Sequence, residues 1–294
     1  MLFSMSKQKK SILIMILIIS LLSGISSFIG IFSGDGTGEF EYTSIRGDDV
    51  KIYGTGIYKH MSSDVAIQGI AHDYVTLFIA IPLLLVALFF FIKNNLKGYI
   101  ALLGILFYFF VTYLFYIVMA MYNELFLVYV VILCLVFFSF IIILFNKPIN
   151  KLIHNFKHKK LIRIGGYFLI INSVMVAFLW LSIIIPPLIS GLIYPKELQH
   201  YTTLIVQGLD LALLLPIGIV SGFLAIKKDK YGYLFTSIYL IFLSILMAAL
   251  SSKIIFMAKE GINVIPVIFI MPTICLISLF FSIAIIKNIN SKLT

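Results

Sequence analysis

Eight stretches of this sequence are almost free of charged side chains and long enough to cross a lipid bilayer. A helix needs about 20 apolar residues to span ~30 Å of hydrocarbon, and a helix satisfies its own backbone hydrogen bonds there without water. The stretches lie near residues 11–33, 74–92, 98–121, 125–145, 164–193, 204–226, 231–252 and 264–286. The sequence therefore predicts an all-α membrane protein with eight transmembrane helices.

The charged residues predict how these helices are oriented. Only 12% of the 294 residues are charged and the net charge is +10, whereas about a quarter of the residues of a soluble domain are charged. Sixteen of the 22 Lys and Arg residues lie in the two terminal segments and in the loops after the second, fourth and sixth spans, together with a single acid, Asp229. The other basic residues, assigned to the outside, are Arg46, Lys51, Lys59, Lys196, Lys253 and Lys259.

Basic residues accumulate on the cytoplasmic side of membrane proteins. We therefore expect a multi-pass protein of the cytoplasmic (inner) membrane of a prokaryote, with the N- and C-termini in the cytoplasm. The positive charge orients the chain and implies no nucleic-acid partner. The first run also has features of a secretory signal, with small residues at Ser23 and Gly24. It continues to Phe32, beyond the usual h-region of about 7–15 residues, which favours a retained anchor; the sequence leaves its cleavage open.

An internal repeat is visible in two ungapped segments. PLLLVALFFFIKNNLKGY at 82–99 and PIGIVSGFLAIKKDKYGY at 216–233 share Pro, Val, Phe, Ile, Lys, Gly and Tyr at an offset of 134 residues. Each segment runs down one span, through a basic turn and into the next span. This predicts two parallel four-helix repeats, at 1–145 and 164–294.

The first repeat carries an extracytoplasmic insert at 34–73. Alternation at Phe40–Ser44, a turn at Arg46–Asp49 and renewed alternation from Val50 predict a β-hairpin, with a third strand expected at Ile57–His60. The stretch Ser62-Ser63-Asp64 resembles a helix N-cap that leads into the second span. A small β-rich insert of this kind is also a candidate surface for a protein partner.

The linker at 146–163 is basic and amphipathic. Apolar residues at helical spacing and a lysine-rich remainder predict a helix on anionic lipid headgroups. His154 and His158 are four residues apart, but no third ligand accompanies them, so the sequence favours no metal site there.

Few ionisable residues lie near the spans. Asp210 is predicted about two turns below the outer surface, with Gln207 one turn further out on the same face. His72 and Asp73 precede the second span, and Tyr116 and Glu124 continue a semi-polar stripe on the third helix. These six residues are the candidate lining of an asymmetric polar pocket that opens to the outside, because ionisable residues in membrane helices usually face a cavity or a partner.

Plainer interpretations stay open at this point. His72, Asp73 and Glu124 fit interfacial residues in contact with water, and Asp210 fits a structural hydrogen bond between helices. The two cysteines, Cys134 and Cys275, fit small apolar residues within spans. All five histidines, at 60, 72, 154, 158 and 200, are expected in loops or at span edges, so no pair is placed to ligate haem, and no cofactor is predicted.

The stretches RGDDVKIYGTGIYKH, DYVTLFIAIPLLLVAL and YNELFLVYVVIL resemble a family of uncharacterised bacterial multi-pass membrane proteins. The resemblance covers the insert and first four spans best. It implies an architecture of about eight spans with a small ectodomain after the first span, and it brings no known activity.

Three classes of function fit these features. The first is binding or transport of a small solute or ion through the outer polar pocket. The second is a membrane enzyme acting on a lipid or lipid-linked substrate at the outer face, with His72, Asp73 and Glu124 in acid, base or ligand roles, together with His60 or His200. The third is a sensor or assembly factor that uses the insert.

Overall fold

Eight long helices form the body of the protein. The computed structural model describes residues 7–290 except 120, 146–148, 150–153, 193, 260 and 262. In this part of the chain, eight helices are long and apolar enough to cross a membrane: Lys7–Phe32, Ser63–Ile92, Leu96–Val118, Phe126–Leu144, Lys159–Ile189, Ile205–Ile226, Lys230–Lys259 and Val267–Lys287. The structure confirms the eight-helix prediction and supports a multi-pass membrane protein.

The elements follow one another in a regular order. The first half contains α1 (Lys7–Phe32), β1 (Phe40–Thr43), β2 (Asp49–Ile52), the 3₁₀ turn η2 (Gly56–Tyr58), α2 (Ser63–Val75), η3 (Thr76–Ala80), α3 (Ile81–Ile92), α4 (Leu96–Val118) and α5 (Phe126–Leu144). The second half contains α7 (Lys159–Ile189), the 3₁₀ turn η4 (Lys196–Leu198), α8 (Ile205–Leu209), η5 (Asp210–Leu214), α9 (Leu215–Ile226), α10 (Lys230–Lys259) and α11 (Val267–Lys287).

Two of the helical spans are longer than the sequence predicts. The second begins at Ser63 rather than near 74, and the seventh ends at Lys259 rather than near 252. Charged and polar side chains such as Asp64, Asp73 and Lys253 lie in the added turns. They ended the apolar runs without ending the helices, because a charged side chain lowers the hydropathy of a segment and leaves its backbone hydrogen bonds intact.

The second and sixth spans each contain a π-helical turn at matching places. In η3 the amide of Ile81 donates to the Thr76 carbonyl, and in η5 the amide of Leu215 donates to the Asp210 carbonyl, five residues back in both cases. Pro82 and Pro216 follow immediately. Proline has no N–H to donate and its ring clashes with the carbonyl four residues earlier, which favours a widened turn before it.

The basic α3–α4 and α9–α10 turns also match in stereochemistry. Asn94 and Lys228 both have positive φ, of 58° and 63°. Asn95 and Asp229 then cap the next helix by accepting from the amides of Lys97 and Tyr231. A Cβ at Gly98 or Gly232 would overlap the end of the preceding helix, so glycine is required in both turns.

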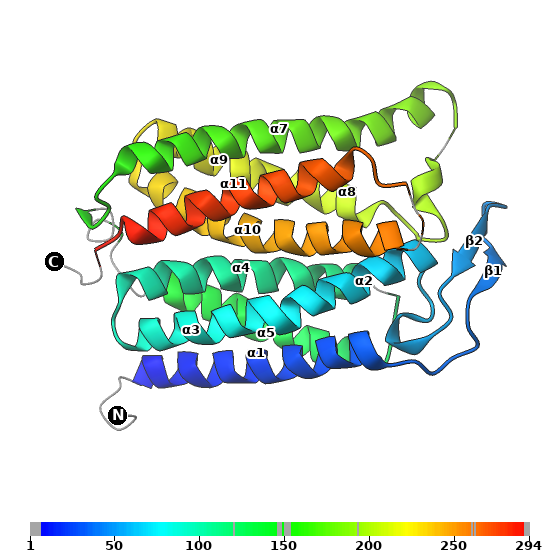
Figure 1. Ribbon diagram of the computed structural model, residues 1–294, viewed down its shortest axis with the longest axis horizontal. Coiled ribbons are helices and arrows are strands. Elements are labelled where there is room, and N and C mark those ends of the chain that lie inside the picture. The colour runs from blue at the N-terminus through cyan, green and yellow to red at the C-terminus, as the bar shows by residue number, and fades with distance from the viewer. Residues whose placement is uncertain are drawn as a thin grey trace.

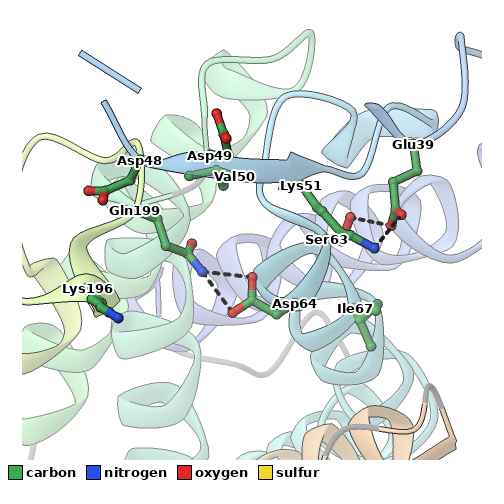
Figure 2. A pocket seen from close by; sticks show the side chains of 10 residues that line it. All are labelled: Glu39, Asp48, Asp49, Val50, Lys51, Ser63, Asp64, Ile67, Lys196 and Gln199. Carbon is green, nitrogen blue, oxygen red and sulfur yellow. Dashed lines mark hydrogen bonds and ion pairs between the residues drawn. The ribbon is translucent and has the colours of Figure 1, made fainter. Parts of the chain in front are cut away.

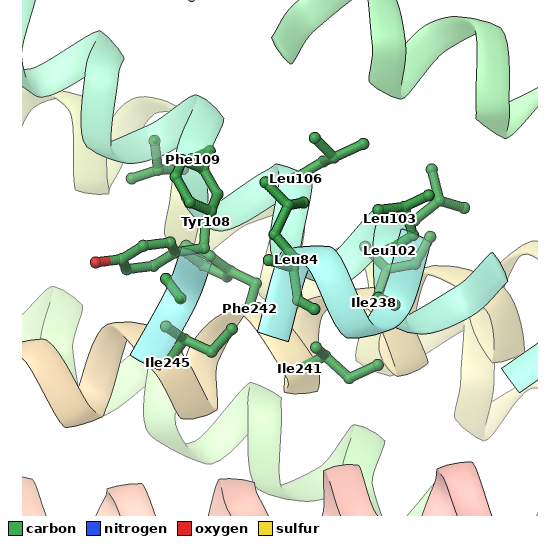
Figure 3. Packing of buried hydrophobic residues seen from close by; sticks show 14 of the residues in the cluster. Leu84, Leu102, Leu103, Leu106, Tyr108, Phe109, Ile238, Ile241, Phe242 and Ile245 are labelled. Carbon is green, nitrogen blue, oxygen red and sulfur yellow. The ribbon is translucent and has the colours of Figure 1, made fainter. Parts of the chain in front are cut away.

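The core lies between α4 and α10, the third helix of each half. Figure 3 shows Leu102, Leu103, Leu106 and Phe109 of α4 beside Ile238, Ile241, Phe242 and Ile245 of α10, with Leu84 of α3 against them. A Cβ at Gly104 would overlap the Ile241 side chain, so this glycine lets the two helices approach closely. In contrast, α5, α7 and α11 leave many large apolar side chains exposed, as lipid-facing helices do.

The insert contains a two-stranded antiparallel sheet, as predicted. Phe40 pairs with Ile52 and Thr43 with Asp49, and the hairpin stands at the end of the bundle opposite the start of α1 and the end of α11 (Figure 1). The expected third strand is wrong, because residues 56–58 form the turn η2, which directs Tyr58 into the bundle. Ser62 does occupy the N-cap position of α2, but its hydroxyl contacts Tyr201 instead of capping the helix.

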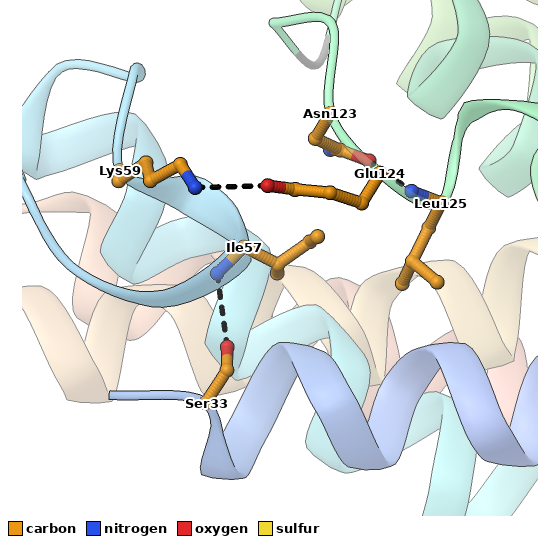
Figure 4. Close-up of polar contacts among 6 residues, drawn as sticks. All are labelled: Ser33, Ile57, Lys59, Asn123, Glu124 and Leu125. Carbon is orange, nitrogen blue, oxygen red and sulfur yellow. Dashed lines mark hydrogen bonds and ion pairs between the residues drawn. The ribbon is translucent and has the colours of Figure 1, made fainter. Parts of the chain in front are cut away.

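Residues at both edges tie the insert to the bundle. The Ser33 hydroxyl, just after α1, accepts from the Ile57 amide at 2.9 Å, and the Lys59 ammonium pairs with Glu124 at 2.9 Å (Figure 4). The Asn123 side chain in turn accepts from the Leu125 amide, just before α5 begins. The insert is therefore anchored to α1 and to the α4–α5 connection.

Residues 146–148 and 150–153 of the predicted amphipathic helix at 146–163 lie outside the described residues. In its described part, Phe156 is buried and pairs with Ile289 near the end of α11. His158 precedes α7, which starts at Lys159. The prediction that this segment lies on anionic headgroups stays a prediction.

Candidate functional site: a cavity between the two halves

A cavity of about 280 Å³ lies where the two halves meet. Its walls come from η2, α2 and α4 of the first half and from α7, α8, η5, α9, α10 and α11 of the second. Most wall residues are apolar. The polar and ionisable ones are Tyr58, Gln68, His72, Thr112, Tyr116, Asn172, Trp180, Asp210, Tyr239 and Lys253. We call this hollow the central cavity.

The central cavity marks a difference between the halves. Helix α2 packs closely on α10, whereas its counterpart α8 makes few contacts with α4. The space left between α4 and α8 is the space that Thr112, Tyr116 and Asp210 line. The central cavity therefore lies on the side of α4 that faces α8.

Asp210 is held at the first residue of the π-helical turn η5. Its Oδ2 accepts a hydrogen bond from the Trp180 indole at 2.8 Å. Trp180 lies on α7, so this bond joins two helices of the second half, as the structural interpretation of Asp210 expects. Asp210 also lines the central cavity, so the same side chain joins two helices and faces a hollow.

Lys253 brings a positive charge to the same cavity from α10. Its ammonium attracts the carboxylates of both Asp210 and Asp73. Within the described part of the chain, however, it forms no direct ion pair or side-chain hydrogen bond. Assigning Lys253 to an outer loop was wrong, because α10 continues for two turns beyond the predicted end of its span.

His72 lies on the opposite wall, on α2. Its Nε2 is 3.0 Å from the hydroxyls of both Thr112 and Tyr108, and the Tyr108 ring stacks against the imidazole. Its Nδ1 has no hydrogen-bond partner among the described residues. His72 is only 5% exposed, so the expectations that it sits at a span edge and faces water are both wrong.

Asp73 lies behind the wall and not in it. Its two carboxylate oxygens accept hydrogen bonds from Tyr58, at 2.5 Å, and from Tyr116, at 2.8 Å. Burial and the neighbouring Asp73 carboxylate raise the pKa of Tyr58 well above its ordinary value, so this phenol stays protonated and donates. A tyrosine of the insert thus reaches into the bundle and meets a carboxylate of α2.

Besides Asp73, two predicted site residues lie outside the lining of the central cavity. Glu124 is largely exposed beside Lys59, and its hydrogen bond to that ammonium lowers the pKa of Glu124. This placement fits the interfacial interpretation. Gln207 lies on α8 outside the cavity lining. Asp210, His72 and Tyr116 do line it, with Asp73 directly behind Tyr116.

A second hollow lies between the hairpin and the α7–α8 connection. It has a volume of about 700 Å³ and is lined by residues from both and from the start of α2, including Asp48, Asp64, Lys196 and Gln199 (Figure 2). The Gln199 amide donates to both oxygens of Asp64 at 3.1 Å. We call this hollow the outer groove.

A latch of hydrogen bonds beside the outer groove joins the insert to the second half. The Arg46 guanidinium donates to the carbonyls of Gln199 and Tyr201 at 3.1 and 2.9 Å and lies over the Tyr194 ring. Next to it, the His200 Nε2 donates to the His60 carbonyl, and burial lowers the pKa of His200. We call the contacts of Arg46 the outer latch.

Several residues of the cavity were not predicted. Lys253, Trp180 and Tyr58 are the main ones. A signal for Lys253 exists in the sequence, because the apolar residues resume directly after it at Ile254–Ala258 without any turn residue. No comparable signal places Trp180 or Tyr58 beside an aspartate, since both pairs are made by tertiary contacts.

The described residues contain no group of three or more His, Cys, Asp or Glu side chains placed to hold one metal ion. Comparison with family models, with curated proteins and with solved structures finds no match to this chain. The resemblance to a bacterial family therefore stays a prediction, and function has to be argued from the cavity itself.

Proposed function

We propose that this chain resides in a prokaryotic cytoplasmic membrane with its N- and C-terminal segments in the cytosol. The distribution of Lys and Arg supports this orientation. The arrangement of elements agrees with it, because the start of α1, the basic α3–α4 and α9–α10 turns and the end of α11 share one end of the bundle, opposite the hairpin (Figure 1).

The two halves are a parallel duplication in this proposal. Matching π-helical turns, positive-φ residues, capping side chains and turn glycines at a constant offset of 134 residues support it. A chance resemblance of apolar helices would explain none of these four details. Duplicated bundles often bind solutes at the interface between their repeats.

The function that the geometry supports best is binding of a small amphipathic solute in the central cavity, as part of transport across or uptake into the membrane. One observation carries the proposal: a single cavity between the halves combines apolar walls with a carboxylate, Asp210, and an ammonium, Lys253. Its volume lies just below the ~300–1,000 Å³ of typical ligand pockets, so the solute is small.

The two other classes of function receive less support. An enzyme at the outer face would need its acid and base side chains together, whereas Glu124 lies away from the cavity and Asp73 is engaged by two tyrosines. A sensor that acts through the insert is favoured by the outer latch, which connects the hairpin to the second half. A substitution that fills the central cavity would impair a solute binder and would leave such a sensor unaffected.

Val176→Phe tests the proposal. Val176 lies on the cavity wall contributed by α7, and a phenyl ring there occupies space that a solute needs. We expect the variant to lose the binding of small solutes that stabilise the wild-type protein. The measurement is thermal unfolding of purified protein in nanodiscs with a panel of short-chain alcohols, amines, carboxylates and amino acids.

The matched control is Val174→Phe on the same helix. Val174 is 38% exposed and lies outside the cavity lining, so this variant should keep every stabilisation seen in the wild type. Equal solute stabilisation in both variants would contradict the proposal, and it would favour a function located in the insert.

A further inference from the structure

The two opposite charges of the central cavity each have unused bonding capacity. Asp210 receives one hydrogen bond, from Trp180 to Oδ2, and none to Oδ1 from any described residue. Lys253 attracts Asp210 through space but does not pair with it directly. A carboxylate and an ammonium on different elements, η5 and α10, are thus held apart in the same hollow.

Such an arrangement is costly in an apolar cavity. Charges taken out of water are stabilised well only by close pairing with hydrogen bonds, and a separated pair keeps much of its desolvation penalty. The neighbouring wall residues Leu246, Met247, Leu250 and Ile274 are apolar and supply no such bonds. A bound molecule that carries both charges would satisfy the two groups at once.

We propose, resting on the solute-binding function above, that the central cavity recognises a zwitterion with a short apolar body. An anionic oxygen group of the ligand pairs with Lys253, its ammonium pairs with Asp210, and its apolar body packs on the α10 and α11 walls. A free amino acid with an apolar side chain has this chemistry, and so does the headgroup region of a zwitterionic phospholipid.

Trp180 provides the assay. It is the only tryptophan of the chain and it donates to Asp210 in the cavity wall, so occupation of Asp210 should shift its emission. The protein is placed in nanodiscs of anionic lipid only and titrated with L-leucine, with 4-methylpentanoate, which lacks the ammonium, and with 3-methylbutylamine, which lacks the carboxylate. Phosphatidylethanolamine added to the nanodiscs tests the lipid source.

Leucine is expected to bind at least about tenfold more tightly than either singly charged analogue, since each analogue lacks one of the two charge-assisted hydrogen bonds. Lys253→Gln should reduce leucine affinity to that of the amine, and Asp210→Asn to that of the carboxylate. The amide oxygen of the asparagine at position 210 can still accept from the Trp180 indole, so Trp180 emission remains a readout of binding in this variant. Lys259→Gln and Glu124→Gln, which alter charges outside the cavity lining, should leave leucine affinity unchanged.

The outcomes separate this inference from the proposed function. A response to phosphatidylethanolamine alone, lost in both charge variants, would support the zwitterion and identify a lipid as its source. Equal affinity for all three soluble probes would overturn the zwitterion and leave solute binding intact. No response to any probe or lipid, with no solute stabilisation of the wild type, would overturn both.

Discussion

At the scale of single residues, a glycine makes room for the most enclosed carboxylate in the structure. Gly30 of α1 faces Asp73 and the Tyr58 hydroxyl, and a Cβ at this position would overlap the Asp73 carboxylate. Gly69 of α2 lies against the other side of the Tyr58 ring. Small residues on two helices thus make the space in which the insert tyrosine reaches the aspartate.

Gly30→Ala should therefore destabilise the protein. The added methyl forces Asp73 to move and weakens its hydrogen bonds with Tyr58 and Tyr116, and overpacking of this kind typically costs about 1–3 kcal/mol. Thermal unfolding in detergent measures the loss. Gly24→Ala is the control on the same helix, because its Cβ would meet only Ile81 at an ordinary 3.8 Å.

Alanine is also the better helix former of the two residues, by about 0.5–1 kcal/mol. Gly24→Ala should thus be neutral or slightly stabilising. Equal unfolding temperatures for the two variants would contradict this prediction. They would mean that the Asp73 carboxylate can move away from an added Cβ at position 30 without loss of stability.

At the scale of elements, the outer latch joins parts of the chain about 150 residues apart. Arg46 at the hairpin turn holds the carbonyls of Gln199 and Tyr201, and Tyr201 in turn contacts Ser62 at the start of α2. The hairpin has only two short strands and little core of its own, and an isolated hairpin is marginally stable. Its position therefore depends on this docking.

Arg46→Gln should loosen the α7–α8 connection. A hydrogen bond to a charged group contributes about 1.5–3 kcal/mol when buried, and the part-buried setting of Arg46 places the expected loss near the lower end. Hydrogen exchange at the Leu198 and Tyr201 amides, which are bonded within that connection, should accelerate about tenfold. Exchange in α4 should not change.

Lys51→Gln removes the same charge from the same hairpin and serves as the control. Lys51 pairs with Glu39 at 3.6 Å, with side chains 69% and 52% exposed. Exposed pairs of this kind contribute between about zero and 1 kcal/mol. Equal exchange in the two variants would mean that Arg46 contributes through net charge and not through the latch.

At the scale of the whole molecule, the proposed orientation can be tested by labelling. Ile45 is 90% exposed at the hairpin turn, and Lys227 is exposed in the α9–α10 turn. In a background without Cys134 and Cys275, a membrane-impermeant maleimide should label Ile45→Cys in intact cells. It should label Lys227→Cys only after the membrane is opened.

The reverse labelling pattern would mean that the protein has the opposite orientation in the membrane, with the hairpin end of the bundle in the cytosol. Labelling of both sites in intact cells would mean that the two ends of the bundle are not separated by a membrane. Either result removes the orientation proposed above, although the cavity and its charges would stand.

Much of the architecture was predictable, because a membrane imposes a simple rule on sequence. Backbone polar groups cannot remain unpaired in hydrocarbon, so long apolar runs have to be helices, and their number follows directly. The hairpin was predictable for a similar local reason, since its alternation and turn residues are contiguous. The third strand at Ile57–His60 failed because Tyr58 is drawn to Asp73, a contact that local pattern does not contain.

The candidate site was predictable only in part. Asp210 and His72 were identified because polar residues near the middle or edge of a span are costly and need a reason. Glu124 and Gln207 are also polar residues near a span, but they lie outside the cavity. Lys253 was placed in a loop because a charge at the end of an apolar run has the same local signature whether it faces water or a cavity.

The sequence by itself determined eight helices, the hairpin after the first of them and the matching turns of the two halves, since each depends on residues close together in the chain. Only the tertiary structure decided that Trp180 meets Asp210, that Lys253 faces the same hollow and that Tyr58 reaches Asp73. Those pairings depend on how closely helices far apart in sequence approach one another. That distance is set by glycines, by apolar packing and by the gap between α4 and α8, which no single segment encodes.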